Sequence, residues 1–117
     1  QSWHPEGGMI SKRRREMEKV KIYLDEHFTE KIRLADLSER FFMNKYYLTR
    51  VFKEIYGATI SHYVLSRRIT RAKQLGRFSD MTMDEIAAAV GMNDANYFSR
   101  AFRKIEGVSP TEYQKQW

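Results

Sequence analysis

The sequence predicts an all-α chain built from two helix-turn-helix subdomains joined by a long central helix. Three observations predict this fold. Residues 47–63 recur fifty positions later as residues 97–113, with Tyr, Arg, Phe, Ile, Gly and Tyr at matching places. Residues 34–44 align with residues 83–93, so each copy contains a short helix, a turn and a longer helix. No segment alternates polar and apolar residues for long enough to form a strand.

The first half contains three predicted helices. The first begins at Lys12, and its buried stripe recurs at three- and four-residue spacing: Met17, Val20, Leu24, His27 and Phe28. The second is short and is marked by apolar residues: Leu34, Leu37 and Phe41. The third has an apolar face of four residues: Leu48, Val51, Phe52 and Ile55. Asn44 can cap this third helix, and Gly57 can end it in the left-handed conformation.

A long basic helix follows over residues 59–78 and leads into the second copy. A capping box from Thr82 to Glu85 opens a short helix with an apolar stripe: Ile86, Ala89 and Val90. Asn93 or Asp94 can cap the next helix, which has a core face of four residues: Phe98, Ala101, Phe102 and Ile105. Gly107 can end it. A second capping box begins at Ser109, with Pro at the first helical position, and opens a final short helix.

Composition limits the classes of partner. The chain has 117 residues, of which 42% are hydrophobic and 31% charged, which is typical of a globular domain. No run approaches the roughly 20 apolar residues of a spanning helix, and no secretory signal is visible, so no membrane partner is expected. The absence of cysteine excludes a disulfide framework and Cys-ligated zinc, and it fits the cytoplasm. The net charge of +6 favours an acidic partner.

Each longer helix carries a row of polar side chains opposite its core face. In the first copy the row is Tyr46, Thr49, Arg50 and Lys53, and in the second it is Asn96, Ser99, Arg100 and Arg103. Arg can bind guanine O6 and N7 together, and Asn can bind adenine N6 and N7. The last residue of each row lies one turn further along and suits a phosphate. A solvated helix shows a similar row, but the repetition of Arg in register behind matching turns favours DNA.

The central helix is the right length and charge to serve both copies. About twenty residues at 1.5 Å each span roughly 30 Å, close to the roughly 34 Å between successive major-groove faces. Its basic residues are Arg67, Arg68, Arg71, Lys73 and Arg77. Solvation accounts for about half of them, and pairing with a neighbouring carboxylate is an alternative for Arg71. We assign four further residues to phosphate contacts: Tyr47, Tyr97, Arg67 and Arg68.

Several strings of the sequence resemble one known family. They are YLTRVFK at residues 47–53, RRITRAKQL at 67–75, IAAAVGMNDANYFSRAFRK at 86–104 and GVSPTEY at 107–113. Over about residues 16–113 the chain resembles the DNA-binding domain of the AraC/XylS family of bacterial transcription regulators. The resemblance implies two helix-turn-helix subdomains, seven helices in all, that read adjacent major-groove segments on one face of double-stranded DNA.

The resemblance also implies a domain layout and a set of base-reading residues. Residues 12–117 are expected to form an AraC-type DNA-binding domain. It would consist of a first helix-turn-helix unit at residues 12–58, a linking helix at 59–78 and a second helix-turn-helix unit at 79–117. Residues 1–11 become a linker or residues added for expression. The base-reading positions fall on Lys45, Tyr46, Thr49 and Arg50 in the first copy, and on Asp94, Ala95, Asn96, Ser99 and Arg100 in the second.

Partners outside the chain follow from the same resemblance. Such domains usually follow an N-terminal sensing or dimerising domain, which we expect to be missing from this chain. RNA polymerase is the expected protein partner, and activation is the commoner mode of regulation in the family.

Three positions depart from the family pattern. Arg33 stands where a Ser or Thr cap is commoner, and Gly76 replaces an apolar residue in the central helix. Phe42 occupies the first turn at the place where the second turn has Gly91. None of these positions belongs to the predicted base-reading rows.

Two rival functions make different demands on the sequence. An enzyme is not expected, because His4, His27 and His62 are scattered, no metal-ligand spacing occurs and no nucleophile–base pair is apparent; neither a metal nor a cofactor is expected. DNA-alkylation response proteins carry a related domain with an acceptor Cys, which this chain lacks. A helical protein-interaction module remains an alternative. It would not need Arg50 and Arg100 in register, and its binding would lack a steep salt dependence.

Overall fold

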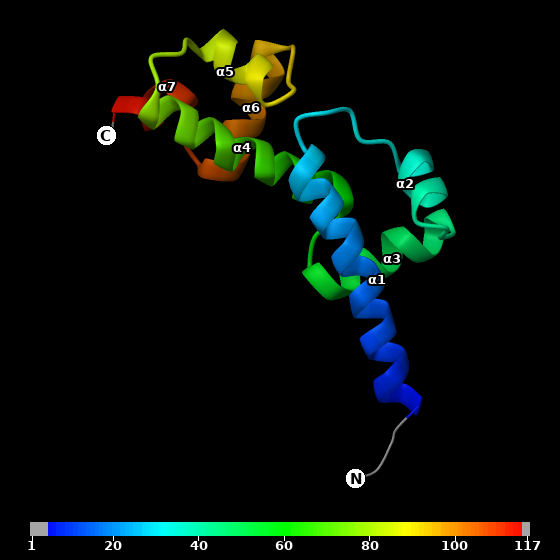
Figure 1. Ribbon diagram of the computed structural model, residues 1–117. Helices are drawn as coiled ribbons and strands as arrows, with labels where there is room; N and C mark the ends of the chain where they lie inside the picture. Colours follow the sequence, from blue (N-terminus) through cyan, green and yellow to red (C-terminus); the bar gives the residue numbers. More distant parts are fainter. Residues whose placement is uncertain (1–4, 116–117) are drawn as a thin grey trace. The chain divides into compact units, whose positions relative to one another are not determined.

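The computed structural model describes the backbone of residues 5–115 and the side chains of residues 11–115. Within this part of the chain there are seven α-helices and no strand, which confirms the all-α prediction (Figure 1). The helices are α1 (Pro5–His27), α2 (Leu34–Arg40), α3 (Lys45–Tyr56), α4 (Ile60–Phe78), α5 (Met83–Ala89), α6 (Ala95–Glu106) and α7 (Pro110–Lys115).

Helix α1 begins earlier than the sequence pattern predicts. We expected a helix from Lys12, whereas α1 starts at Pro5. Proline suits a first helical position because its missing N–H would have no partner there. The residues interpreted as a linker therefore include the first turns of α1.

The chain packs into two compact units. Among the described residues, the first consists of residues 5–27 and 32–63, and the second of residues 28–31 and 64–115. The division falls inside α4, after its first turn, rather than at its ends. The short segment between α1 and α2 belongs to the second unit, which the sequence pattern did not indicate.

Local capping signals set most helix ends. Asn44 accepts a hydrogen bond from the Tyr46 amide at 2.8 Å, and Asp94 accepts from two amides at the start of α6. The cap of α6 is therefore Asp94 rather than Asn93. Both halves of the predicted capping box at Thr82 are present, with bonds of 2.8 and 3.2 Å to Glu85. Arg33 precedes α2 without a side-chain capping bond, as its departure from the family pattern suggested.

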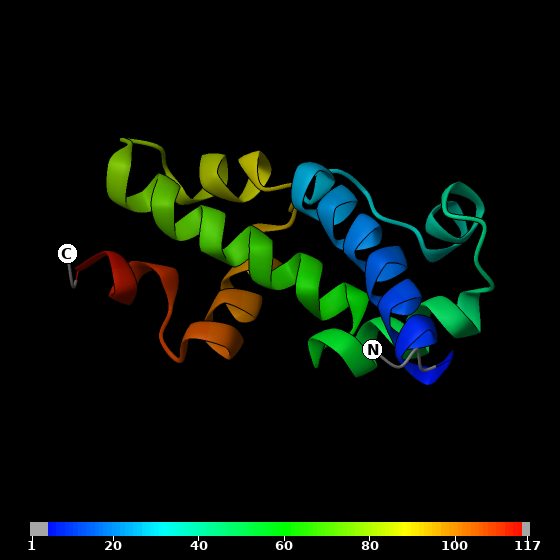
Figure 2. The same ribbon diagram turned by 60° about the horizontal axis from the view of Figure 1, so that its bottom comes forward.

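In the first unit, α1 packs along α3 (Figure 2). The buried side chains of α1 are those predicted from its spacing, apart from His27 and Phe28, which are only partly buried: Met17, Val20 and Leu24. The core face of α3 and one residue of α2 are buried as well: Leu48, Val51, Phe52 and Leu37. This packing leaves the opposite face of α3 exposed.

In the second unit, α4, α5 and α6 share one core. Its buried members are Ile69, Ala72, Ile86, Ala87, Val90, Met92, Phe98, Ala101 and Phe102. Ile105 and Tyr113 pack against this cluster from its edge. As in the first unit, the buried stripe of the longer helix leaves its polar row on the outside.

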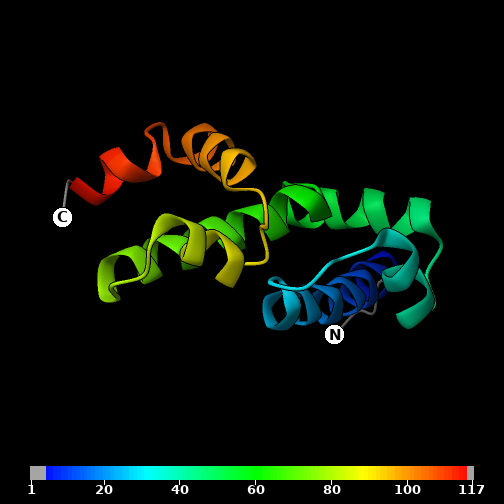
Figure 3. The same ribbon diagram turned by 90° about the horizontal axis from the view of Figure 1, so that it is seen from above.

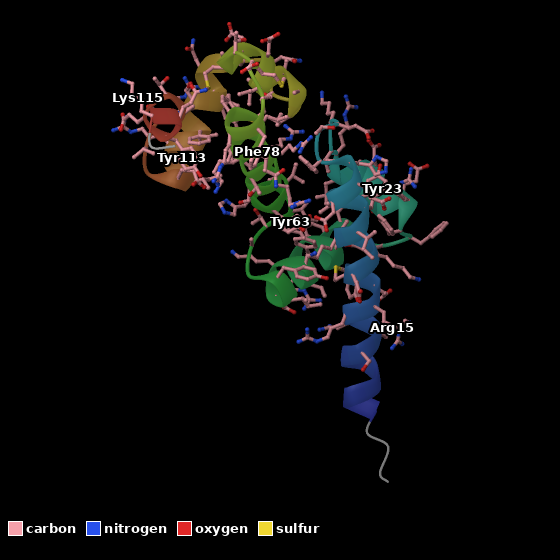
Figure 4. All side chains as sticks on the ribbon, turned by 60° about the vertical axis from the view of Figure 1, so that its left-hand side comes forward. Arg15, Tyr23, Tyr63, Phe78, Tyr113 and Lys115 are labelled. Carbon is pink, nitrogen blue, oxygen red and sulfur yellow. The ribbon has the colours of Figure 1, made fainter. Side chains whose placement is uncertain are left out.

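The sequence repeat is also a repeat of packing. Tyr63 contacts Phe52 edge-on at 5.7 Å, and Tyr113 contacts Phe102 edge-on at 5.5 Å (Figure 4 labels both tyrosines). A lysine lies over each tyrosine ring, Lys21 at 5.7 Å in the first unit and Lys73 at 5.8 Å in the second. Each lysine also pairs with a carboxylate, at 3.2 Å in both units. The two copies therefore share the tyrosine–phenylalanine contact and the lysine over the tyrosine ring, whereas the carboxylate lies on α1 itself in the first unit and on α6 in the second.

The first unit should lose stability at alkaline pH. Burial raises the pKa of Tyr47, Tyr56 and Tyr63, with additional effects of Glu16 on the first and Asp25 on the last. A raised folded-state pKa contributes stability that is complete below the unfolded value of 10.0 and is lost as the pH rises through the folded value. Denaturant unfolding between about pH 8 and 11 should show this decrease.

Tyr63→Phe tests this prediction because it removes one titrating group and keeps the ring. The decrease above pH 10 should become shallower in this variant. Equal slopes in the wild type and Tyr63→Phe would contradict the assignment.

Candidate nucleic-acid interface

The polar row of α3 forms one continuous exposed face. The four residues of this row and Lys45, which the resemblance adds, are all exposed: Lys45, Tyr46, Thr49, Arg50 and Lys53. Four of them line a groove of about 550 Å³ together with Leu34, the first residue of α2 (Figure 3 shows α2 and α3 from above). The predicted base-reading residues of the first unit are therefore brought together. Leu34 is an apolar member of this face that the polar pattern did not indicate.

Arg50 is held along the helix by an acidic residue that the sequence reading missed. Its guanidinium lies 3.6 Å from Glu54, whose second oxygen lies 3.9 Å from Arg13 of α1. The spacing of four residues between Arg50 and Glu54 is a signal that could have revealed this pair. Both side chains are about half exposed, so the pair contributes only about 0.2–1 kcal/mol. A guanine edge can therefore compete for Arg50.

The polar row of α6 is exposed in the same way. Asn96, Ser99, Arg100 and Arg103 lie on the face opposite the buried Phe98 and Phe102. Two predicted base-reading residues at the start of α6 are placed differently. Ala95 is half-buried, and the Asp94 carboxylate accepts the amides of Asn96 and Tyr97 at 2.9 and 3.2 Å. Asp94 thus has a structural role as the cap that orients the row.

Two residues predicted to contact phosphate already have partners within the fold. The Tyr47 hydroxyl donates to Glu16 at 3.0 Å, and burial together with this carboxylate raises its pKa. The Arg67 guanidinium stacks over the Phe28 ring at 5.2 Å. Arg71, for which a carboxylate partner was the alternative, donates instead to the amide oxygen of Gln74 at 3.2 Å.

Arg68, also assigned to phosphate, points into the second unit. Its three nitrogens donate to the backbone carbonyls of Phe28 at 2.6 Å, Glu30 at 2.8 Å and Gly91 at 3.4 Å. Burial lowers its pKa. Arginine offers five N–H groups in a fixed fork, which suits several acceptors at once. Arg68 thus ties residues 28–31 to the turn before α6, and we leave it out of the phosphate set.

Arg68→Ala should destabilise the protein by about 1.5–3 kcal/mol. The reason is that the backbone carbonyls that accept hydrogen bonds from the charged guanidinium would be left without this donor in a partly buried place. Arg68→Lys should recover little, since an ammonium cannot reproduce the fork. Chemical denaturation measures both. Arg71→Ala is the matched control on the same helix, with an expected change within about 0.5 kcal/mol. Equal effects of the two alanine variants would argue against the anchoring role.

Among the described residues, no helix is long and apolar enough to cross a membrane. Nor do three or more His, Asp or Glu side chains gather there in a way that could hold a metal ion.

Comparison with known proteins places this architecture in a family. The model of a helix-turn-helix domain matches residues 37–116. An uncharacterised HTH-type transcriptional regulator of Bacillus subtilis, YisR, is 41% identical over 93 residues, which are 80% of this chain and 32% of that protein. The chain thus spans about a third of the length of this relative.

Solved structures show the same fold. The C-terminal domain of AraT, a response regulator from Geobacillus stearothermophilus, superposes with a TM-score of 0.83 at 29% identity, over 87% of this chain and 85% of that one. The DNA-binding domain of AdpA, solved in complex with a target DNA, has a TM-score of 0.79 at 25% identity, over 86% and 90% of the two chains. This chain belongs to the AraC-type helix-turn-helix family.

Proposed function

We propose that the chain is the DNA-binding part of a bacterial transcription regulator and reads double-stranded DNA with two recognition helices, α3 and α6. The observation that carries the proposal is the repeated exposed row with arginine in register, Arg50 and Arg100, each opposite a buried apolar stripe. AdpA, a structural neighbour, was solved bound to DNA. The chain acts by binding, without catalysis.

The exposed rows divide into base-reading and phosphate-binding positions. We propose base contacts from Lys45, Tyr46, Thr49 and Arg50 in the first unit and from Asn96, Ser99 and Arg100 in the second. Lys53 and Arg103 suit phosphate because each lies one turn further along its helix and is exposed. Tyr97, exposed beside the second row, completes this set.

The rest of the regulator lies outside this chain. Relatives such as YisR are about three times as long as the part they share with it. We propose that an N-terminal sensing or dimerising domain completes the protein, that RNA polymerase is its protein partner and that the regulator is an activator. Its place would be the cytoplasm, on the nucleoid.

Selection of bound duplexes from a random pool tests the proposal. The expected motif has two base-specific patches about 10 base pairs apart, one helical turn of DNA. A single short patch, or two patches at variable spacing, would contradict reading by two helices. Binding that is insensitive to salt would favour a protein-interaction module instead.

Substitutions can distinguish the residues that recognise bases from the residues that bind phosphate. Arg50→Ala and Arg100→Ala should each cost about 1–3 kcal/mol on the best site and relax preference in one half only. Lys53→Ala and Arg103→Ala should weaken all sequences alike and make the log–log salt slope shallower by about one unit each. Affinity titrations at several salt concentrations measure both. Unchanged sequence preference in folded Arg50→Ala and Arg100→Ala would overturn the assignment of the reading face.

A further inference from the structure

Exposed apolar side chains of the first unit gather around its turn. Leu34 at the start of α2 is 38% exposed, Tyr46 in the first turn of α3 is 85% exposed, and Phe42 between the two helices is 94% exposed. Elsewhere in the described part of this unit, Ile22 on α1 is a further large apolar side chain with high exposure, at 49%. Three of the four large apolar side chains that are exposed in the described part of this unit therefore lie on the turn and its flanking helices.

Phe42 strains the backbone of the turn and contributes no buried apolar surface to the fold. Its φ of 53° lies in the left-handed region, where a bulky side chain costs about 1–2 kcal/mol and glycine costs little. The ring is almost fully exposed, so folding gains no apolar burial from it. A residue that strains a turn without packing against the protein indicates a role in binding.

A groove lined by residues of α2 and α3 combines apolar and cationic walls. Leu34 and Tyr46 line it together with Lys45, Thr49 and Arg50, and its volume is about 550 Å³. The major-groove edge of DNA offers the same combination, because the thymine methyl group is apolar while guanine presents two acceptors to arginine. The cations complement the phosphates on either side. The major-groove edge of DNA therefore matches this face both in chemistry and in charge.

The second unit lacks these apolar groups at the matching places. Gly91 stands where the first unit has Phe42, and Asn96 stands where it has Tyr46. Met83, which matches Leu34, packs against the core of its own unit. At the places that match Leu34, Phe42 and Tyr46, the second unit therefore has no exposed apolar side chain.

We propose that the first unit recognises thymine methyl groups beside the guanine bound by Arg50, through Leu34, Phe42 and Tyr46. The proposal rests on the DNA-binding function proposed above and specifies what one half of the site contains. The second unit, with its amide and hydroxyl groups, reads hydrogen-bonding patterns without this apolar contact. The two halves of the target thus differ in chemistry as well as in sequence.

Replacing thymine by uracil in the selected duplex removes only the methyl group. Each uracil in the half read by the first unit should raise Kd about fourfold, the value of one buried methyl-sized group. The same replacement in the other half should leave Kd unchanged and serves as the internal control. A first-half motif without thymine, or equal binding of thymine and uracil duplexes, would overturn the proposal.

Phe42→Gly separates binding from folding. Its Tm should equal or exceed that of the wild type, because glycine accepts the left-handed turn. Its affinity for the thymine duplex should nevertheless fall severalfold, and the difference between thymine and uracil duplexes should shrink. Leu34→Ala and Tyr46→Ala should act in the same direction. Phe78→Ala, at a 77% exposed phenylalanine of α4, is the matched control and should bind both duplexes as the wild type does.

The outcomes of these experiments distinguish a failure of the thymine contact from a failure of DNA binding itself. A wild-type chain that selects no duplex overturns DNA binding itself and this proposal with it. A wild-type chain that selects a duplex, while Phe42→Gly, Leu34→Ala and Tyr46→Ala bind it unchanged, overturns the thymine contact alone. The apolar surface would then serve a protein partner instead.

Discussion

Phe102→Ala is expected to lower the free energy of unfolding by about 3–5 kcal/mol, the usual cost of truncating a buried phenylalanine. The ring is 3% exposed, packs against Phe98 and receives Tyr113 edge-on. Because small domains are stable by only about 5–15 kcal/mol, this loss is large enough to unfold much of the population. Circular dichroism during denaturant unfolding would measure it.

Phe52→Ala should have an effect of similar size in the first unit, since Phe52 is fully buried and holds the same position against Tyr56 and Tyr63. Arg103→Ala, next to Phe102 on the exposed face of α6, is the control and should change stability by at most about 0.5 kcal/mol. A loss below about 1 kcal/mol for either phenylalanine would contradict the core described here.

Gly91→Ala is expected to destabilise the second unit by about 2–5 kcal/mol. The residue has a φ of 89°, which costs an L side chain about 1–2 kcal/mol. A Cβ there would also lie 2.2 Å from the Thr29 carbonyl oxygen, so residues 28–31 must move, and overpacking typically costs about 1–3 kcal/mol more. The movement would also disturb the Arg68 bonds to Phe28 and Glu30.

Gly57→Ala and Gly107→Ala are matched controls for the backbone contribution. Both glycines are left-handed, with φ of 74° and 85°, but a Cβ would meet no atom within 4 Å at either position. Each should therefore cost only the 1–2 kcal/mol or so of the left-handed conformation. Thermal unfolding of the three variants gives the comparison. Equal losses at all three positions would show that the close approach of Thr29 does not matter.

Helices, caps and core stripes could be predicted from the sequence because they depend on neighbours within a few residues. The capping box at Thr82, the left-handed ends at Gly57 and Gly107 and the buried stripes of α3 and α6 all follow from local spacing. The exposed rows followed with them, since a helix face opposite a buried stripe must face water. In the structure, Lys45, Tyr46, Thr49 and Arg50 line one groove, and their role in base reading stays a prediction.

Contacts between distant residues could not be predicted in this way. Arg68 has the same pattern as its basic neighbours, yet its acceptors lie 23 to 40 residues away. The Tyr47 hydroxyl is committed to Glu16, 31 residues away, and the carboxylate of Asp94 to the cap of α6. The sequence alone does not show whether a basic or aromatic side chain contacts a backbone carbonyl within the fold or a phosphate of DNA.

The sequence by itself determined that this chain is all-α, that it contains two copies of one unit, and which face of each longer helix is polar. These features depend on periodicity and capping, which act over one or two turns of helix. Only the tertiary structure decided that residues 28–31 join the second unit, that Arg68 anchors them, and that Phe42 strains an exposed turn. The physical reason is that backbone carbonyls carry no sequence signature, so their partners become known only when the chain brings them together.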